Sequence, residues 1–428
     1  MNRKQRRWAA RQGATPERSS SSVVRELLAD ALRRRLAGRL DEAERDYRRI
    51  LAIDPHHAES LHRLGVIADQ AGRHEVAIDL LGQAIAINPT ESAYHTNLGN
   101  ALRALGRLDE AATGHRRALA LNPDDAVARN NLGNVLRDQG KLTEAVACYE
   151  SALALKPDYA MAHHNLGTAL LAQNRLEEAV AQYERALTLR PGFAMGYGNL
   201  GSALIAQGKL EEAVECFSQA LDLNPDDAQT RSNLLMCLNY TDRTAADIFA
   251  AHRQFGETAA RALAASPPVH ENGRNLDRRL RIGYVSADFK DHSVAWFFAP
   301  LLAAHDPAAV EVFCYAQVIQ PDAVTERLKG QADHWVSTVG MSDQALAERI
   351  RADRIDILVD LAGHTAHNRL TMFALKPAPV QATWLGYPNT TGLAAMDWRL
   401  VDAVTDPPGE ADAFATETLV RLEDGFLC

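Results

Sequence analysis

Apolar and small positions in the first half of the chain recur with a fixed period of 34 residues, and this rhythm stops after Tyr240. Alanine, glycine and proline each keep their own place in the period: Ala43, Ala77, Ala111, Ala145, Ala179 and Ala213; Gly65, Gly99, Gly133, Gly167 and Gly201; Pro55, Pro89, Pro123, Pro157, Pro191 and Pro225. Small residues let two antiparallel helices approach closely, and a proline ends the second helix before the next pair begins. The pattern therefore predicts stacked helical hairpins, one for each period.

A second periodic set marks where the first helix of each hairpin must end. It consists of Gly38, Gly72, Gly106, Gly140 and Gly208, with Asn174 in the place of the missing glycine. These residues best adopt the left-handed backbone conformation found at helix ends. A helical repeat of this length is typical of tetratricopeptide (TPR) repeats. We predict a TPR solenoid over residues 23–240, with six full repeats and, at TRSNLLMCLNY (230–240), the first helix of a seventh.

One position of the first helices is repeatedly asparagine, which is a poor residue for a helix interior. The set is Asn97, Asn131, Asn165, Asn199 and Asn233. The first helices of a TPR superhelix line its concave surface, so these amides are expected to stack into a ladder. An amide can bond both the N–H and the C=O of a peptide backbone, so the ladder predicts a groove that holds extended peptides. The alternative is that asparagine is simply common at this place in TPR repeats.

After the repeats the pattern changes to alternating helices and strands. A helix (TAADIFAAHRQFGETAARALAA) and a polar linker are predicted over residues 241–278. From residue 279 onward, apolar runs predict strands at 279–289, 310–318, 356–363 and 380–386. Helical stretches between them begin at Val294 and lie at 322–332, 342–353 and 368–375. This alternation predicts an open, doubly wound α/β sheet over residues 279–428.

Three of the predicted strands are followed by polar loops. The loops carry Asp288, Asp291 and His292 after the first strand; His364, His367, Asn368 and Arg369 after the third; and Tyr387, Asn389, Thr390, Thr391 and Gly392 after the fourth. Ligands of open α/β sheets bind at the carboxyl ends of the strands, so the three loops together predict a binding site. Two plainer explanations stay open: Asp288 caps the following helix, or the histidines are merely solvated.

Composition and charge narrow the classes of function. The net charge of −9, without a basic stripe, disfavours nucleic acid as a partner. The longest apolar run, VAWFFAPLLAA (294–304), is too short to span a membrane. The basic segment 1–22 lacks the apolar core of a secretory signal and is predicted to be a disordered tail. Five scattered cysteines indicate a reducing, cytoplasmic location, and no Cys-X-X-Cys or Asp-X-Asp pattern suggests a metal site.

The TPR array with its asparagine ladder is followed in the sequence by two distinctive runs, RIGYVSADFKDH (281–292) and FALKPAPVQATWLGYPNTTG (373–392). In this combination the chain resembles the protein O-GlcNAc transferase family from Val23 to Cys428. The resemblance implies a two-lobed GT-B fold that transfers N-acetylglucosamine from UDP-N-acetylglucosamine to serine or threonine, with inversion and without a metal or other cofactor. It also implies that the TPR superhelix feeds the acceptor protein, as an extended peptide, into the cleft.

The family's DFxxH motif corresponds to Asp288 and His292. The resemblance implies that both lie in the active site, with the histidine as a base or as a contact that holds donor and acceptor. Neighbouring branches of the family carry asparagine where Asp291 stands and proline where Ser293 stands.

The family's Leu-Gly-Tyr-Pro loop lies near the sugar, which implies substrate contacts for Leu385, Gly386 and Pro388. His364 and Thr391, from the polar loops described above, complete the set of candidate substrate-binding residues. The five ladder asparagines are the candidate acceptor-peptide groove.

In the family, the grip on UDP comes from a second Rossmann-like lobe, and residues 279–428 have room for only one lobe. The chain is therefore expected to carry the N-terminal half of a GT-B domain, truncated after ETLVRLEDGFLC, and to bind UDP-N-acetylglucosamine poorly without turning it over. A homo-oligomer or a partner chain is a possible source of the other lobe. Two non-catalytic functions stay open: a TPR scaffold with a relic half-domain, and a TPR clamp for a partner's C-terminal carboxylate.

Overall fold

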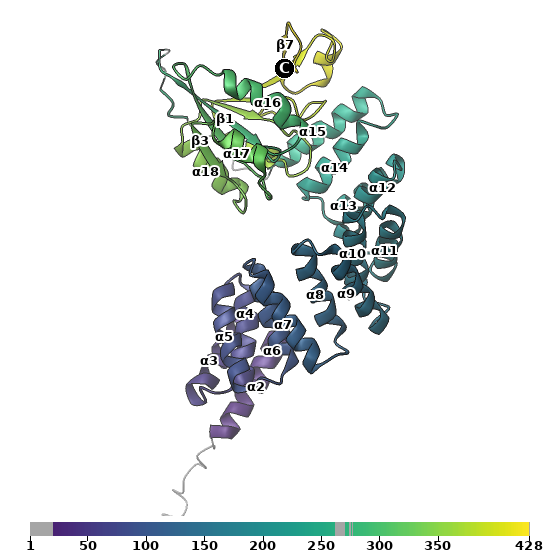
Figure 1. Ribbon diagram of the computed structural model, residues 1–428, viewed down its shortest axis with the longest axis vertical. Helices are drawn as coiled ribbons and strands as arrows, with labels where there is room; N and C mark the ends of the chain where they lie inside the picture. The colour runs from purple at the N-terminus through teal and green to yellow at the C-terminus, as the bar shows by residue number, and fades with distance from the viewer. Residues whose placement is uncertain (1–19, 262–269, 274, 276, 428) are drawn as a thin grey trace, which may run out of the picture. The chain divides into compact units, whose positions relative to one another are not determined.

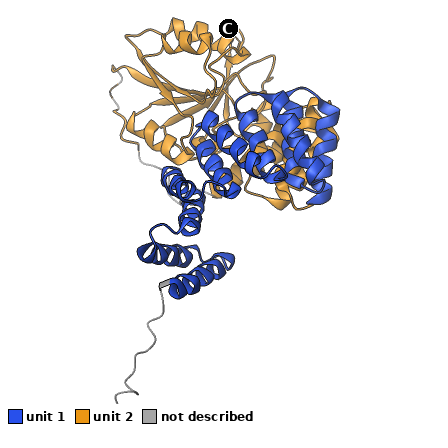
Figure 2. Cartoon of the chain, turned by 60° about the horizontal axis from the view of Figure 1, so that its bottom comes forward, with its two compact units in different colours: residues 1–190 blue, residues 191–428 orange. Residues whose placement is uncertain are grey.

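The computed structural model describes residues 20–261, 270–273, 275 and 277–427 (Figure 1). The predicted tail 1–22, except for residues 20–22, and residues 262–269 of the predicted helix and linker lie outside the described residues. The chain divides into two compact units, residues 1–190 and 191–428, which Figure 2 shows in different colours.

Helical hairpins make up the described part of the first unit. Its helices are α2 (Ser20–Leu36), α3 (Leu40–Ile53), α4 (Ala58–Gln70), α5 (His74–Ile87), α6 (Ser92–Ala104), α7 (Leu108–Leu121), α8 (Ala126–Asp138), α9 (Leu142–Leu155), α10 (Ala160–Ala172) and α11 (Leu176–Leu189). The second unit begins with α12 (Ala194–Ala206), α13 (Leu210–Leu223), α14 (Ala228–Leu238) and α15 (Ala245–Arg261). Six hairpins followed by the first helix of a seventh confirm the predicted TPR fold.

Close approach of the two helices in a hairpin depends on glycine. At Gly133 an added Cβ atom would lie 2.6 Å from Cε1 of Tyr149, a residue that is completely buried. Carbon atoms that are not bonded do not approach so closely, so a larger residue would push the helices apart. The predicted helix ends are confirmed as well, because Gly140 and Asn174 have φ angles of 76° and 59°.

The rest of the second unit is an α/β lobe built on one parallel sheet. Its strands are β1 (Leu280–Ser286), β2 (Val310–Ala316), β3 (His334–Ser337), β4 (Ile357–Asp360), β5 (Val380–Thr383), β6 (Trp398–Asp402) and β7 (Thr418–Leu422), in the spatial order β3-β2-β1-β4-β5-β6-β7. The helices are α16 (Ser293–Ala304), α17 (Ala323–Lys329), α18 (Asp343–Ala352), α19 (Leu370–Ala374) and the short 3-10 helix η1 (Ala411–Phe414). The predicted Rossmann-like sheet is confirmed.

The strand order places a topological switch point between β1 and β4. From β1 the chain first adds β2 and β3 on one side, and it then adds β4 to β7 on the other. The crevice between the carboxyl ends of two such strands is where open α/β sheets bind ligands. Beneath it, Phe289, Phe298 and Leu361 are completely buried in one hydrophobic cluster.

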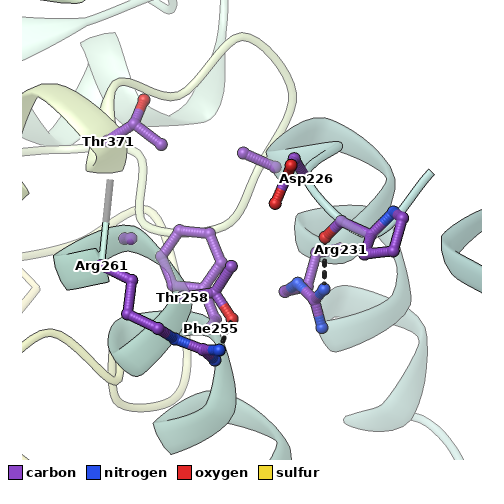
Figure 3. A pocket seen from close by; sticks show the side chains of 9 residues that line it. Asp226, Arg231, Phe255, Thr258, Arg261 and Thr371 are labelled. Atoms are coloured by element: carbon purple, nitrogen blue, oxygen red, sulfur yellow. Dashed lines mark hydrogen bonds between the residues drawn. The ribbon is translucent and has the colours of Figure 1, made fainter. Parts of the chain in front are cut away.

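The helices that lead into the lobe enclose a cavity with α19. It has a volume of about 460 Å³ and is lined by residues of α14, α15 and α19, among them Arg231, Phe255 and Arg261 (Figure 3). Among the described residues, no helix is long and apolar enough to cross a membrane.

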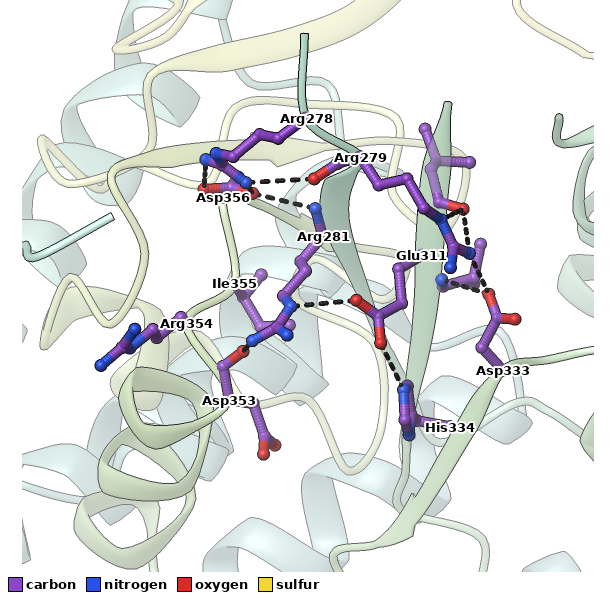
Figure 4. A network of polar contacts seen from close by, with 12 residues as sticks. Arg278, Arg279, Arg281, Glu311, Asp333, His334, Asp353, Arg354, Ile355 and Asp356 are labelled. Carbon is purple, nitrogen blue, oxygen red and sulfur yellow. Dashed lines mark hydrogen bonds and ion pairs between the residues drawn. The ribbon is translucent and has the colours of Figure 1, made fainter. Parts of the chain in front are cut away.

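Ion pairs gather at the amino ends of the strands, opposite the switch-point crevice (Figure 4). Asp356 accepts hydrogen bonds from both terminal nitrogens of Arg278, at 2.6 and 2.5 Å, and from the backbone N–H of Arg281 at 2.9 Å. Burial acts to raise the pKa of Asp356, but the bonds from Arg278 and Arg281 outweigh it and lower the pKa. Glu311 joins Arg281 to His334, at 3.0 and 2.7 Å. The charged side chains named here, at the amino ends of the strands, are thus paired with one another.

Candidate functional site

The three polar loops singled out in the sequence lie at one edge of the sheet. They follow β1, β4 and β5, which are neighbouring parallel strands, so their carboxyl ends meet. Side chains from all three loops pack together, because Phe289, Leu361 and Leu385 belong to one hydrophobic cluster. The sheet therefore places the three loops at one edge, and the roles of the predicted site residues stay a prediction.

His292 caps α16, and its hydrogen bonding defines its tautomer. Nδ1 accepts the backbone N–H of Val294 at 3.2 Å, so the neutral ring carries its proton on Nε2. The Asp288 carboxylate lies 3.9 Å from Nδ1, and the His292 side chain is 43% exposed. His292 thus carries an N–H donor on a partly exposed ring, beside a helix N-terminus whose dipole favours negative charge. The sequence-based alternative that Asp288 caps α16 is wrong, because His292 does so.

The loops after β4 and β5 touch through their backbones. A Cβ atom at Gly386 would lie 2.0 Å from the carbonyl oxygen of Leu361, and one at Gly363 would lie 2.2 Å from Cβ of Tyr387. Leu385 has a φ angle of 75°, a conformation that costs a leucine of the order of 1–3 kcal/mol. Such strain persists only where the surroundings fix the backbone, and here the two contacts fix it. Leu385 and the exposed Pro388 line a cavity of about 250 Å³.

Two buried carboxylates that the sequence analysis missed organise these loops. Asp360, at the end of β4, accepts the backbone N–H groups of Ala362 and Gly363 and the hydroxyl of Thr383, at 3.1, 2.8 and 2.8 Å. Burial raises its pKa to about 6. The sequence signal was an acidic residue inside an apolar strand, ILVDLAG, where an unpaired carboxylate is costly.

Glu417 plays the corresponding part for the loop after β5. Its carboxylate accepts the backbone N–H of Thr391 at 2.7 Å and the Thr390 hydroxyl at 2.6 Å, and the Thr391 hydroxyl donates to it as well. Thr391 is completely buried. Its burial favours a role in loop structure. Direct contact of Thr391 with substrate stays a prediction.

His364 is also buried, at 1% exposure, and both ring nitrogens are bonded. The backbone carbonyl of Thr391 can only accept, so Nε2 of His364 donates to it, at 2.9 Å. Nδ1 therefore accepts the hydroxyl of Ser232, at 3.0 Å, which comes from α14. Burial, with His252 nearby, lowers the pKa of His364 to about 3. These contacts favour a structural link between the repeats and the lobe over contact with substrate.

Tyr387 forms a second link to the repeats. The carbonyl of Ile248 accepts from Nδ1 of His252, at 2.7 Å, so Nε2 of that ring accepts the Tyr387 hydroxyl, also at 2.7 Å. The same hydroxyl accepts from Nδ2 of Asn239 at 2.7 Å, and Asn389 donates to Asn239 at 2.9 Å. Burial lowers the pKa of His252 to about 4. These partners are about 130 to 150 positions apart in sequence, so no local pattern announced them.

We call this set of contacts the junction: α14 and α15 packed against residues 361–364 and 387–392. Its backbones are in direct contact. A Cβ atom at Gly256 of α15 would lie 1.8 Å from the carbonyl oxygen of Gly392, and one at Gly392 would lie 2.0 Å from the carbonyl oxygen of His252. The junction therefore holds the loop after β5 from the side of the TPR helices.

The ladder asparagines of the first unit bond to the preceding first helix. Nδ2 of Asn131 donates to Asn100 at 3.1 Å, and Nδ2 of Asn165 donates to Asn130 at 2.9 Å. Asn97 lies with Nδ2 2.6 Å from Nε2 of His62. Each amide nitrogen carries a second hydrogen, which is the group a bound peptide would use. Asn165 is only 7% exposed, whereas Asn97 and Asn131 are half-buried.

The second unit contains the other two ladder positions. Asn199 lies on α12 and Asn233 on α14, and both are half-buried. Oδ1 of Asn233 accepts from Gln229 at 2.9 Å. Binding of peptide by the five asparagines stays a prediction. Within the described ranges, no group of three or more histidine, cysteine and acidic side chains is placed to hold a metal ion.

Comparison with known proteins matches two parts of the chain to families. Residues 229–428 match the model of glycosyl transferase family 41. TPR models match residues 35–101, 99–136, 133–173, 167–208 and 194–227. The molecule is thus a TPR protein that carries the first lobe of a GT-B glycosyltransferase.

Individual relatives point to one family. A Petunia hybrida protein described as a probable UDP-N-acetylglucosamine–peptide N-acetylglucosaminyltransferase, SPINDLY, is 41% identical over 201 residues, which cover 46% of this chain and 21% of that protein. A Caenorhabditis elegans UDP-N-acetylglucosamine–peptide N-acetylglucosaminyltransferase is 36% identical over 199 residues, or 45% and 17% of the two chains. A mutant of the Thermobaculum terrenum O-GlcNAc transferase has a similar structure, with a TM-score of 0.65, 35% identity and coverage of 71% and 58%.

Together, the family 41 match of residues 229–428, the TPR matches before it and these relatives support a TPR array with the N-terminal GT-B lobe of the protein O-GlcNAc transferase family. The recognition made from the DFKDH and LGYP runs is confirmed. The matched segment spans about a fifth of the length of the curated relatives.

Proposed function

We propose that the protein transfers N-acetylglucosamine from UDP-N-acetylglucosamine to serine or threonine hydroxyls of polypeptides, with inversion at the sugar. The observation that carries the proposal is that the DFKDH loop, after β1, and the LGYP loop, after β5, lie at one edge of the sheet on either side of β4, in a lobe that matches the glycosyl transferase family 41 model. The named activity of the relatives supports the choice of sugar and acceptor.

In the proposed reaction, His292 is a hydrogen-bond donor and not the base. Nδ1 is occupied by the Val294 N–H, so Nε2 has a proton to donate to an oxygen of the sugar nucleotide. The acceptor hydroxyl oxygen bonds to the anomeric carbon while the bond from that carbon to the diphosphate oxygen breaks. The hydroxyl proton passes to a carboxylate, for which Asp288 stands next to His292. Negative charge developing on UDP is favoured by the N-terminus of α16.

The acceptor is proposed to reach this crevice as an extended peptide held by the ladder asparagines. Two of them, Asn97 and Asn131, are half-buried and carry an amide hydrogen beyond the one used within the ladder. Backbone bonds of this kind hold a peptide without selecting its sequence. The proposal includes a reducing, cytoplasmic location, which the free thiols of Cys148, Cys237 and Cys314 support, and a reaction that needs no metal.

A transfer assay tests the proposal. The chain supplied with the family's second lobe, joined to it or as a separate chain, is incubated with UDP-[14C]N-acetylglucosamine and an extended serine-containing peptide, with and without EDTA. Residues 1–428 alone, which are expected not to turn over, are assayed beside it. We expect label on the peptide, no effect of EDTA, and a loss of about 100-fold or more for His292→Ala. His334→Ala is the matched control, because this exposed histidine lies at the opposite end of the sheet.

The rival function is a TPR scaffold that binds peptides without modifying them. It shares the asparagine ladder, so peptide binding alone does not separate the two. Saturable peptide binding with no labelled product at saturating sugar nucleotide would contradict the transferase proposal and favour the scaffold. Dependence of binding on a free C-terminal carboxylate would favour the clamp variant of that scaffold.

A further inference from the structure

The cavity between α14, α15 and α19 contains none of the candidate site residues, but it holds two cationic side chains. Arg231 comes from α14 and Arg261 from the end of α15, and Figure 3 shows Phe255 between them. The Phe255 side chain is 2% exposed, so it forms an apolar wall. Thr258 of α15 and Thr371 of α19 add hydroxyl groups to the lining.

The position of Arg231 in the repeat accounts for only one of the hydrogen bonds that an arginine makes at this position. Three repeats earlier, Arg129 donates from Nη2 to the carbonyl of Pro123 at 2.6 Å, and Arg231 donates from Nη2 to the carbonyl of Pro225 at 2.7 Å. Each bond closes the turn before the helix. Arg129 also donates from Nη1 to Ser151 of its hairpin's second helix, at 3.0 Å. In the described part of the chain, Arg231 has no counterpart of that second bond.

The two guanidinium groups carry charge that the described residues leave unpaired. Arg261 donates from Nε to the carbonyl of Glu257 at 3.2 Å and from Nη2 to the Thr258 hydroxyl at 3.4 Å. No ion pair to a carboxylate involves Arg231 or Arg261 within the described ranges. Burial and the neighbouring charge of Arg261 lower the pKa of Arg231, so the two cations repel each other. An arginine stays charged at neutral pH even so.

We propose that this cavity binds a phosphate or carboxylate group carried on a small apolar body. The oxyanion accepts N–H donors from Arg231 and Arg261, which relieves their repulsion, and the apolar body lies against Phe255. The volume of about 460 Å³ is in the range of sites for small molecules. Asp226 also lines the cavity, and its negative charge should weaken the binding of an anion. Removing that charge should therefore strengthen binding. The inference is independent of the proposed transferase activity.

Calorimetric titration with phenyl phosphate tests the proposal on the full chain. We expect saturable binding that weakens about tenfold or more in Arg231→Gln and in Arg261→Gln, because each loses a charged hydrogen bond. Arg253→Gln is the matched control, because Arg253 lies on α15, pairs with Glu257 and does not line the cavity. Asp226→Asn should strengthen binding about threefold by removing a like charge.

A second variant guards against misfolding of the arginine variants. Ala259→Phe fills the cavity without removing charge and should abolish the binding of phenyl phosphate. Phenol, the neutral analogue, should bind equally weakly to the wild type, Arg231→Gln and Arg261→Gln. Equal affinity of phenyl phosphate for the wild type, Arg253→Gln and Arg261→Gln would overturn the proposal. So would the absence of saturation at millimolar phenyl phosphate.

A second titration decides whether the anionic group belongs to a polypeptide side chain or to a free small molecule. An extended peptide with one phosphoserine is titrated against the wild type, Arg231→Gln and Asn233→Ala. If the cavity takes the side chain of a polypeptide, the peptide binds more tightly than phenyl phosphate and loses affinity in both variants. If it takes a free small molecule, phenyl phosphate binds at least as tightly as the peptide, and Asn233→Ala leaves its affinity unchanged.

Discussion

The repeat stack of the first unit (α2–α11) and the junction of the second unit both pack helices closely, but different interactions hold them. In the stack, glycine lies under a large ring, as at Gly133 and Tyr149, and the contact is mainly apolar. In the junction, backbone meets backbone at Gly256 and Gly392, and buried polar groups are paired around it. The stack is a repeated contact of one kind, whereas the junction is a single arrangement specified by hydrogen-bond direction.

This difference indicates which of the two regions tolerates amino-acid substitutions. A hairpin in the stack contacts mainly its neighbours, so repeats can be exchanged or mutated with local effects. The junction satisfies its buried hydroxyl and ring nitrogens only in one geometry, and losing one partner leaves the others unpaired in a low-dielectric interior. We therefore expect the junction to be the more sensitive region to the loss of single polar atoms.

Acid should have the largest effect on the junction. The pKa values of His252 and His364 are lowered to about 4 and about 3, so the unfolded chain, whose histidines titrate near 6.5, binds more protons below neutral pH. Their stabilisation is complete above about pH 6.5 and is lost as the pH falls through about 4. For His364 the full difference is of the order of 5 kcal/mol. Protonating His252 also removes the acceptor of the Tyr387 hydroxyl.

Hydrogen exchange measured from pH 7 to pH 4, corrected for intrinsic rates, checks this expectation. Protection in α14, α15 and residues 384–393 should fall, while β2, which lacks these histidines, keeps its protection longer. Asp360 works in the opposite sense, because its pKa is raised to about 6 and its protonation favours the fold as the pH falls. Uniform loss of protection in β2 and the junction would contradict a local acid response.

Adding one methyl group should separate the two regions next. Gly256→Ala places a carbon 1.8 Å from the Gly392 carbonyl oxygen, so α15 must move, and we expect a loss of about 3 kcal/mol. Gly82→Ala, in α5 of the stack, is the matched control, because nothing lies within 4 Å of its added carbon. That change should stabilise the chain by about 1 kcal/mol through helix propensity. Urea unfolding followed by circular dichroism measures both.

The stack could be predicted from sequence and the junction could not, for one physical reason. Contacts in the stack recur in every repeat, so the pairing of Gly133 with Tyr149 can be recognised from the equivalent positions of the other repeats. The edge of the sheet that carries the site was also predictable, because strand ends and polar loops are local features. Tyr387 and Asn239 meet across about 150 residues, and neither has a sequence pattern that reports the other. The short strands β3, β6 and β7 were missed because their few apolar residues form no run.

Removing one hydroxyl should have a smaller effect on the junction. Tyr387→Phe leaves the Nε2 acceptor of His252 and one donor of Asn239 unpaired, at a cost of about 2 kcal/mol. Tyr183→Phe removes a hydroxyl that bonds Thr168 at 3.1 Å in the stack, and should cost less than 1 kcal/mol, because only one partner is involved. Thermal unfolding compares the two variants. Equal losses would remove the distinction between a network and a single bond.

The smallest expected effect is a gain, and it lies in the stack. His115 occupies the place held by Tyr149 one repeat later; it is completely buried, and neither ring nitrogen has a hydrogen-bond partner among the described residues. Tyr149 donates its hydroxyl to Asn134 at 2.9 Å, and Asn100 stands at the corresponding place for residue 115. His115→Tyr should therefore stabilise the chain by about 1 kcal/mol at pH 7.5.

The gain of His115→Tyr should grow in acid, which distinguishes it from ordinary improved packing. Burial lowers the pKa of His115 to about 4, so the wild type loses stability as the pH falls from about 6.5, and tyrosine does not titrate there. At pH 5 the expected advantage is about 3 kcal/mol. Urea midpoints of His115→Tyr and His115→Phe at both pH values measure it: the two variants should share the acid-dependent part, and only the tyrosine gains the bond to Asn100. A pH-independent difference from the wild type would mean that the buried His115 ring is no harder to protonate than a histidine of the unfolded chain, and would contradict this prediction.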